Sequence, residues 1–146
     1  GAGVSSKSGK VFSNVMKPTR DIKPFLEITA LVGRDPNKTL VSCPFGSTGY
    51  GGAMGPSQFI PSTWQILKNR IAQALGVKNA DPWSPKDAFM ASAMLLTDKG
   101  AIGNSASLEH IAACKYYGTG GSTCSYSNSV MKLKIGIQNN IDLLQD

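Results

Sequence analysis

The sequence has little of what metal-binding, nucleotide-binding or membrane-spanning proteins need. Its longest apolar stretch, residues 88–96, is too short to cross a bilayer, which takes about 20 residues. The only histidine is His110, and the three cysteines form no Cys-x-x-Cys pair, so a four-ligand zinc site would be hard to assemble. The glycine-rich stretches 3–10 and 49–55 both lack the spacing of a nucleotide-binding loop. We therefore expect no membrane span, no metal and no cofactor.

Positive charge exceeds negative charge, but it is spread thinly along the chain. The 146 residues include 15 Lys and Arg against 9 Asp and Glu, which gives a formal net charge of +6. No basic cluster alternates with aromatic residues, as grooves for single-stranded nucleic acid require. We expect no nucleic-acid partner, whereas the diffuse positive field favours a polymer rich in carboxylates or phosphates. A chain of this length can bury a sizeable core, and we expect a monomer.

Two of the cysteines, Cys114 and Cys124, flank a glycine-rich stretch at residues 118–121. Flexible glycines would let the two sulfur atoms approach, and a bond between them would indicate an oxidising compartment. Three reduced and buried thiols are the alternative on composition alone. We predict that the pair is bonded, which leaves Cys43 free in this chain or paired to a cysteine outside it.

Apolar residues recur mostly at helical spacing, and strand-like alternation is scarce. The clearest case is the stripe of Trp64, Leu67, Ile71 and Leu75, which ends at Gly76. A proline in the first turn and a glycine at the end mark several of the helices. We expect helices over residues 24–33, 61–76, 85–99, 107–117 and 130–144, the last with an apolar stripe of Val130, Leu133, Ile137, Ile141 and Leu144.

The helix expected over residues 85–99 is apolar or small on every side, which is typical of a helix buried all round. Residues 34–55 contain proline and glycine together with apolar anchors, so we expect a long ordered loop. The fold class is therefore mainly α, with short helices around a central buried helix and a long ordered glycine-rich loop. We interpret residues 1–20 as an arm or loop that would follow a missing N-terminal helix, and residues 21–146 as one domain.

The most unusual segment is residues 50–64, where glycines stand beside Tyr, Met, Gln, Phe and Trp. Exposed backbone and aromatic faces could form the floor of a groove in which sugar rings stack and amides bind their hydroxyl and acetamido groups. The alternative is a glycine-rich turn into a helix whose aromatics are core residues, above all Phe59, Ile60 and Trp64. The residues of this segment that we expect to line a groove are Tyr50, Met54, Gln58 and Phe59.

Three blocks of sequence, in this order, resemble the lytic transglycosylases of the membrane-bound B type and their soluble relatives. The first is the Gly-Ala-Met-Gly turn at residues 52–55, which runs into Gln58-Phe59 and then Pro61-Ser62-Thr63. The second is residues 81–88 with Lys99-Gly100-Ala101, and the third is residues 112–118, where Tyr117 replaces the commoner asparagine. The resemblance of the third block implies that Tyr116 and Tyr117 also line the groove. Long motifs in a fixed order rarely match by chance.

This resemblance implies a lysozyme-like fold and cleavage of the β-1,4 bond between N-acetylmuramic acid and N-acetylglucosamine, with formation of an anhydro end. It implies a periplasmic, cell-envelope or secreted protein of bacteria that binds peptidoglycan glycan strands. In the family one glutamate acts first as acid and then as base, in a Glu-Ser pair upstream of the glycine-rich block. This chain has no Glu-Ser pair.

The catalytic acid is therefore unknown from the sequence. The only glutamates are Glu27, which we expect to face solvent, and Glu109, which we expect in the first turn of a helix, where the helix dipole favours a carboxylate. In members of this family a block like residues 15–21 follows the catalytic helix, so the resemblance leads us to expect that this chain starts downstream of its acid. We expect a lytic transglycosylase domain without its usual glutamate, or alternatively a non-catalytic peptidoglycan-binding or cell-wall assembly module.

Overall fold

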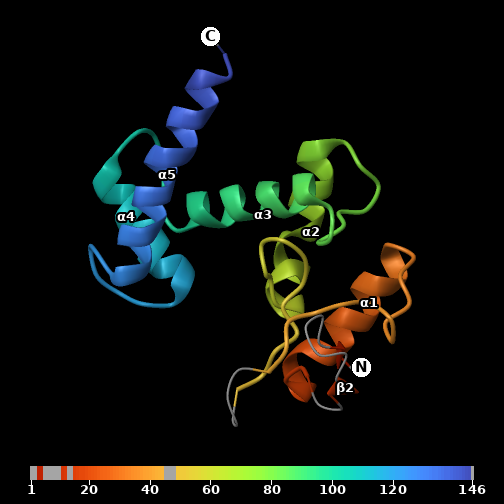
Figure 1. Cartoon of the computed structure of the whole chain (residues 1–146). Helices are drawn as coiled ribbons and strands as arrows, with labels where there is room; N and C mark the ends of the chain where they lie inside the picture. The colour runs from red at the N-terminus through yellow and green to blue at the C-terminus, as the bar shows by residue number, and fades with distance from the viewer. Residues whose placement is uncertain (1–2, 5–10, 13–14, 45–48, 146) are drawn as a thin grey trace. The chain divides into compact units, whose positions relative to one another are not determined.

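The computed structural model describes residues 3–4, 11–12, 15–44 and 49–145 (Figure 1). The chain divides into two compact units, residues 1–92 and residues 93–146, which are described separately below. Helices dominate the described residues of both units, which confirms the predicted mainly α class. Part of the segment predicted to be an N-terminal arm lies outside the described residues.

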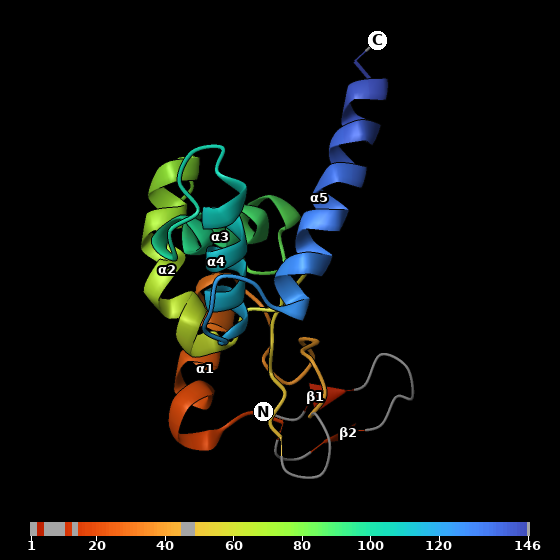
Figure 2. The same cartoon turned by 90° about the vertical axis from the view of Figure 1, so that its left-hand side faces the viewer.

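The first unit contains a short strand pair, a helical turn and three helical segments. Strands β1 (Gly3–Val4) and β2 (Val11–Phe12) pair in antiparallel fashion, with Gly3 opposite Phe12 (Figure 2). They are followed by the π-helical turn η1 (Pro18–Ile22), α1 (Lys23–Leu31), α2 (Pro61–Leu75) and the first half of α3 (Pro85–Asp98). Residues 32–44 and 49–60 connect α1 to α2 without a further helix, as predicted for the long loop.

Helix α2 forms where the sequence pattern predicted it. Pro61 occupies the first turn, where a missing N–H costs no hydrogen bond, and Trp64, Leu67 and Ile71 face the core. Gly76 ends the helix in the left-handed conformation, with φ of 65°, which glycine adopts without steric cost. The apolar stripe therefore buries one face of the helix and leaves the other to solvent.

The core of the first unit lies between α1, α2 and the loop segments around them. Phe25 of α1 meets Trp83 edge to face, with ring centroids 6.4 Å apart, and Phe59 meets Trp64 in the same way at 5.9 Å. Among the described residues of this unit, the buried apolar side chains include Val15, Met16, Phe25, Ile28, Met54, Phe59, Trp64, Leu67, Ile71, Ala80, Ala88 and Ala91.

A buried carboxylate joins η1 to the start of α2. Asp21 is completely buried, accepts hydrogen bonds from Arg20 at 2.6 and 2.8 Å, and accepts another from the backbone N–H of Ser62 at 3.2 Å. Burial alone would raise the pKa of Asp21, but the hydrogen bonds from Arg20 and Ser62 outweigh burial and hold it below the ordinary value. The negative charge also lies at the N-terminus of α2, where the helix dipole favours it.

Helix α3 is not buried all round, so that expectation was wrong. Asp87, Ala88 and Ala91 are its buried residues, while the side chain of Phe89 is 64% exposed. The small residues of this helix pack on one face only, and the boundary between the two compact units falls within it, after Ser92. The small and apolar composition of α3 suggested burial on every side, but other segments pack against only one of its faces.

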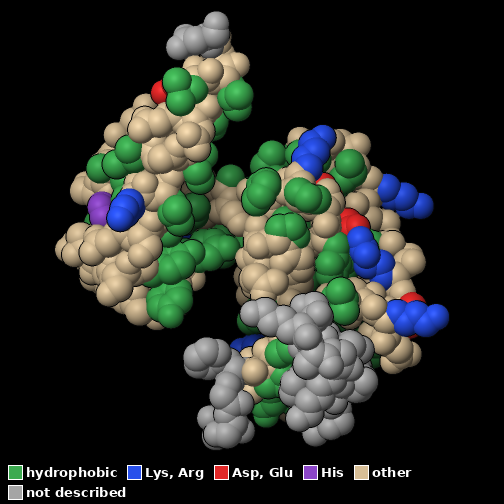
Figure 3. Space-filling model, in the orientation of Figure 1, with side chains coloured by type: hydrophobic (Ala, Val, Ile, Leu, Met, Phe, Trp, Pro, Cys, Tyr) green, Lys and Arg blue, Asp and Glu red, His purple; other side chains and the backbone are tan. Residues whose placement is uncertain are grey.

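The second unit consists of the end of α3 and two further helices, α4 (Ala106–Tyr117) and α5 (Ser125–Leu143), which pack together. Both were predicted as helices. The C-terminal half of α5 extends beyond α4 (Figure 2). The apolar stripe of α5 is largely exposed (Figure 3), with the side chain of Leu133 64% exposed and that of Ile137 58% exposed. Among the described residues, no helix combines the length and apolar character that crossing a bilayer requires.

A disulfide between Cys114 and Cys124 connects the end of α4 to the start of α5, as predicted. Cys124 is also the N-cap of α5: its side chain accepts from the backbone N–H of Ser127, whose hydroxyl accepts from the N–H of Cys124 in return. The Ser127 hydroxyl lies 2.9 Å from Nδ1 of His110 on α4. Because Ser127 is completely buried within this capping arrangement, the pair is a structural connection between the two helices.

Candidate functional site

A pocket of about 360 Å³ opens beside the glycine-rich turn of the first unit, within the size range of small-ligand sites. Its walls come from three segments that are distant in the sequence: the loop before the turn, the turn itself, and the segment that leads into α3. The lining residues are Leu40, Val41, Ser42, Cys43, Ala53, Gly55, Gln58 and Trp83.

The floor of the pocket is formed by close backbone contacts between two loop segments. Ser42 donates its N–H to the carbonyl of Ala53 at 2.8 Å, and its hydroxyl accepts from the N–H of Ala53 at 2.9 Å. The N–H of Gly52 returns a bond to the Ser42 carbonyl at 2.9 Å. A side chain at Gly51 would overlap the backbone of Ser42 and Cys43, so glycine is required for this contact.

The turn continues with Gly55, which has φ of 60° and lies against the backbone of Pro82. A Cβ atom at this position would overlap the Pro82 carbonyl. The turn is closed by an isolated antiparallel bridge in which the N–H of Met54 donates to the carbonyl of Phe59 at 2.9 Å. The Gly-Ala-Met-Gly sequence therefore brings the turn into direct contact with the segment before α3.

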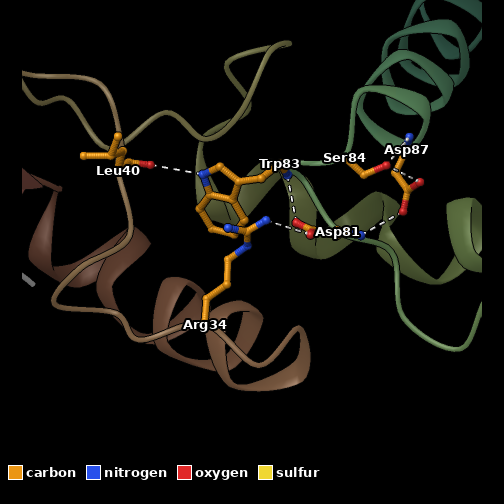
Figure 4. A network of polar contacts seen from close by, with 6 residues as sticks. All are labelled: Arg34, Leu40, Asp81, Trp83, Ser84 and Asp87. Atoms are coloured by element: carbon orange, nitrogen blue, oxygen red, sulfur yellow. Dashed lines mark hydrogen bonds and ion pairs between the residues drawn. The ribbon is translucent and has the colours of Figure 1, made fainter. Parts of the chain in front are cut away.

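Trp83 forms one wall of the pocket and is fixed on several sides (Figure 4). Its indole Nε1 donates to the carbonyl of Leu40 at 3.0 Å, and the guanidinium carbon of Arg34 lies 4.8 Å from the ring centroid. Arg34 also donates to a carboxylate oxygen of Asp81 at 3.0 Å, while the other Asp81 oxygen accepts from the N–H of Trp83 at 2.8 Å. The aromatic wall is thus positioned before any ligand arrives.

The same network continues into the first turn of α3 (Figure 4). Asp87 accepts from the backbone N–H of Asp81 at 2.9 Å and from the hydroxyl of Ser84 at 2.9 Å. The Ser84 hydroxyl in turn accepts from the backbone N–H of Asp87 at 3.5 Å, so Ser84 and Asp87 cap the start of α3. The cap of α3 therefore also holds the wall of the pocket.

Gln58 is the predicted groove residue that the pocket includes. Its φ is 54°, an unusual value for a residue with a side chain, and its Nε2 donates to the carbonyl of Gly55 at 2.8 Å. This bond uses one amide hydrogen and leaves the side-chain oxygen and the second hydrogen for a ligand. A strained backbone at a pocket residue is a feature that functional sites often show.

The other predicted groove residues of this unit lie in different environments. Met54 is fully buried and Phe59 is 4% exposed, so their side chains belong to the core, as the alternative interpretation of Phe59 held. Tyr50 is 50% exposed, next to the turn in sequence but outside the pocket lining. Ser42 and Leu40, which the sequence analysis did not select, help to form the pocket because of backbone contacts that no local pattern reveals.

Tyr116 and Tyr117 lie in the second unit, where both stack on Tyr126. The Tyr117 and Tyr126 rings are 4.8 Å apart between centroids and 13° from parallel, and Tyr116 lies 6.5 Å from Tyr126. Burial and the neighbouring tyrosines raise the pKa of Tyr126 above its ordinary value. Tyr117 is 64% exposed, so one face of an aromatic cluster is open to solvent beside the disulfide.

The carboxylates of the two glutamates are engaged with other side chains. Glu27 is exposed on α1, as predicted, and accepts a short hydrogen bond from Gln65 of α2. Glu109 lies in the first turn of α4, also as predicted, and accepts from Lys134 at 2.6 and 2.7 Å. The residues that line the 360 Å³ pocket include no carboxylate.

Comparison with known proteins finds no match among family models, curated proteins or solved structures. The described residues also contain no group of three or more metal-ligating side chains. The resemblance to lytic transglycosylases therefore rests on the three sequence blocks quoted above.

Proposed function

We propose that this chain is a lytic transglycosylase domain whose pocket beside the Gly-Ala-Met-Gly turn binds a peptidoglycan glycan strand. The observation that supports this most is the meeting of two of the family-like blocks at one pocket. The first block supplies Gly55 and Gln58, and the second supplies Trp83. Blocks that are separated in sequence but share a pocket are expected if both serve one ligand.

The chemistry of the pocket suits a sugar ring with an acetamido group. The indole of Trp83 lines the pocket and supplies aromatic surface, although Arg34 lies over its ring, and Gln58 offers an amide that can both donate and accept. Sugars bind proteins through this combination of a stacking surface and directed hydrogen bonds. The disulfide of the second unit is compatible with the compartment outside the cytoplasm in which peptidoglycan lies.

Cleavage would additionally require an acid that protonates the glycosidic oxygen, since glycosidases depend on a carboxylic acid with a raised pKa. No carboxylate lines the pocket, which favours the second candidate function, a peptidoglycan-binding module without catalysis. Both candidate functions require binding of the same glycan, but only the enzyme would release a cleavage product. The family-like fold, a lysozyme-like arrangement around the groove, is part of the same proposal.

Glycan binding is tested by calorimetric titration with chitin oligosaccharides and purified disaccharide muropeptides. Replacing Gln58 with Ala should weaken binding by about 1 to 3 kcal/mol, because a bound polar group loses its partner, with little change in melting temperature. Gln73→Ala, an exposed change on α2, is the matched control and should bind as the parent does. Equal affinity in the Gln58 variant and the parent would overturn the assignment of this pocket.

Cleavage is tested by mass spectrometry of peptidoglycan incubated with the chain. Loss of the acid in a glycosidase typically costs a factor of about 10² to 10⁴, so a chain without one should release almost no anhydro-muropeptide. Anhydro products that disappear in a Glu27→Gln variant would show that Glu27 is the acid. Binding without any such product would support the module and exclude the enzyme for this chain.

A further inference from the structure

A second pocket in the first unit lies at the C-terminal end of α1 and beside the second half of α2. Its volume is about 190 Å³, about half that of the pocket near Trp83, and no residue is common to the two. It is lined by Leu31, Lys68, Asn69, Ala72, Lys78, Asn79 and Ala80. Two lysines and two asparagines thus supply its polar groups, and every side chain among them can donate a hydrogen bond.

The two lysines of this pocket have no carboxylate partner among the described residues. The ion pairs of the described residues involve neither Lys68 nor Lys78. Lys68 is half-buried on α2, whereas Lys78 is exposed in the segment after Gly76. A cavity with two unpaired ammonium groups and no carboxylate in its lining has an electrostatic preference for an anion.

The helix ends nearby do not explain the lysines as caps. The last carbonyls of α1 already have donors: Thr29 accepts from the N–H of Arg34, Ala30 from that of Gly33, and Leu31 from Nδ2 of Asn79. At the end of α2, the carbonyls of Ala72 and Gln73 accept from the N–H groups that follow them. Because these acceptors are satisfied, the ammonium groups are available to a ligand.

The hydrogen bond from Asn79 to Leu31 has a second effect. It fixes the segment that carries Lys78 against the end of α1, at a distance of 3.0 Å between donor and acceptor. The two lysines are therefore presented from two segments that are held in place, on α2 and on the fixed loop after it. Because these side chains are carried by ordered segments, binding a ligand costs less conformational entropy.

We propose that this lysine–asparagine pocket binds a phosphate group. Each oxygen can accept from an ammonium or amide donor, and Leu31, Ala72 and Ala80 provide an apolar wall for the adjoining carbon chain. The proposal does not depend on glycan binding at the other pocket. Two ammonium groups match the charge of a phosphate better than that of a single carboxylate, so tighter binding of an acidic peptide would overturn this choice of ligand.

The direct test uses inorganic phosphate and acetate, followed by nitrogen-15 NMR of the full chain. Addition of either anion should shift the side-chain amide signals of Asn69 and Asn79 more than that of Asn128, which lies in the second unit. Calorimetric titrations with a glycerol-phosphate oligomer and with a short glutamate-containing peptide then show which source binds more tightly. Amide signals of Asn69 and Asn79 that stay in place at saturating anion would overturn the proposal.

Charge removal gives the second readout. Lys68→Gln and Lys78→Gln should each weaken binding of the preferred oligomer by about two- to fivefold, and the double variant by about tenfold. Lys86→Gln, an exposed change of the same charge outside both pockets, should have a smaller effect. An equal loss in the Lys86 variant would mean that the diffuse field attracts the anion, and this would overturn the pocket assignment. Because Lys78 is exposed, its variant remains informative if Lys68→Gln impairs folding.

The failure of this proposal can be distinguished from the failure of the proposed function. Gln58→Ala should leave anion binding unchanged, and Lys78→Gln should leave chitin-oligosaccharide binding unchanged, because chitin oligosaccharides carry no anionic group. If Gln58→Ala weakened phosphate binding as much as Lys78→Gln does, the anion would lie at the first pocket and the second would carry no site.

Discussion

The two compact units differ in how they are charged and in what holds them together. Residues 1–92 contain eleven Lys and Arg against five Asp and Glu, whereas residues 93–146 contain four of each, so the first unit carries the whole net charge of +6. The first unit also contains most of the buried apolar residues. In the second unit these are Ala112, Ala113 and Cys114 alone among the described residues.

This difference shows two ways of stabilising a small unit. The first unit buries Trp64, Phe25 and Met54 completely or nearly so, and its stability rests on apolar burial. The second unit joins two helices by a disulfide and a reciprocal cap at Cys124, with its largest apolar side chains exposed on α5. Small units with little core commonly depend on a covalent link of this kind.

The largest expected effect comes from the core of the first unit. Trp64→Ala should reduce the free energy of unfolding by about 3 to 5 kcal/mol, because it removes the largest buried side chain and leaves a cavity. Ile66→Ala on the same helix is the matched control and should cost little, since Ile66 is 76% exposed. Urea unfolding followed by circular dichroism measures both. A small effect of Trp64→Ala would mean that burial is not what holds this unit.

The disulfide is the corresponding element of the second unit. Replacing Cys114 and Cys124 together by Ala should cost about 2.5 to 3 kcal/mol on the chain-entropy estimate, since the bond closes a loop with a sequence separation of 10. Hydrogen exchange should show the loss as faster exchange of backbone amides in α4 and α5. Cys43→Ala, which removes the free thiol, serves as the control. Unchanged exchange in these helices would show that α4 and α5 pack stably without the bond.

The smallest of the three expected effects on stability is the contribution of the buried Asp21 carboxylate, which depends on pH. Because the pKa of Asp21 in the folded protein lies below the ordinary value of an aspartate, the carboxylate stabilises the fold at pH values above that ordinary pKa. This contribution is lost as the pH falls through the folded-state pKa. Asp21→Asn should cost about 2 kcal/mol at neutral pH and progressively less as the pH falls through the folded-state pKa. Melting curves from pH 7 to 2 measure the difference, with the exposed Asp142→Asn as control; a parallel loss at all pH values would contradict the assignment.

Local signals explain most of what the sequence predicted correctly. Helix α2 contains the whole stripe of Trp64, Leu67 and Ile71 and ends at Gly76. Periodicity and cap chemistry were therefore enough to predict it. The bond between Cys114 and Cys124 was predictable for the same reason, since both lie near one glycine-rich turn. Gln58 was selected from a motif of neighbouring residues, and the structure places it in a pocket.

The elements that sequence reasoning missed depend on residues far apart in the chain. The bond from Trp83 to the Leu40 carbonyl spans 43 positions, and that from Ser62 to Asp21 spans 41. Neither contact produces a periodic pattern in the sequence, so the pocket wall and the buried carboxylate could be identified only in the folded structure. The misjudged burial of α3 has a different cause: composition reports how apolar a helix is and not how many partners surround it.

The state of the three cysteines makes the pocket directly observable. Two are joined to each other, and the third, Cys43, is exposed and lies in the lining of the pocket near Trp83. A maleimide dye added to the untreated protein should therefore attach at a single place, without any engineered residue. The emission wavelength and fluorescence polarisation of such a dye would report whether the pocket is filled by water or by a ligand. The unmodified sequence therefore already contains an attachment point for a fluorescent reporter.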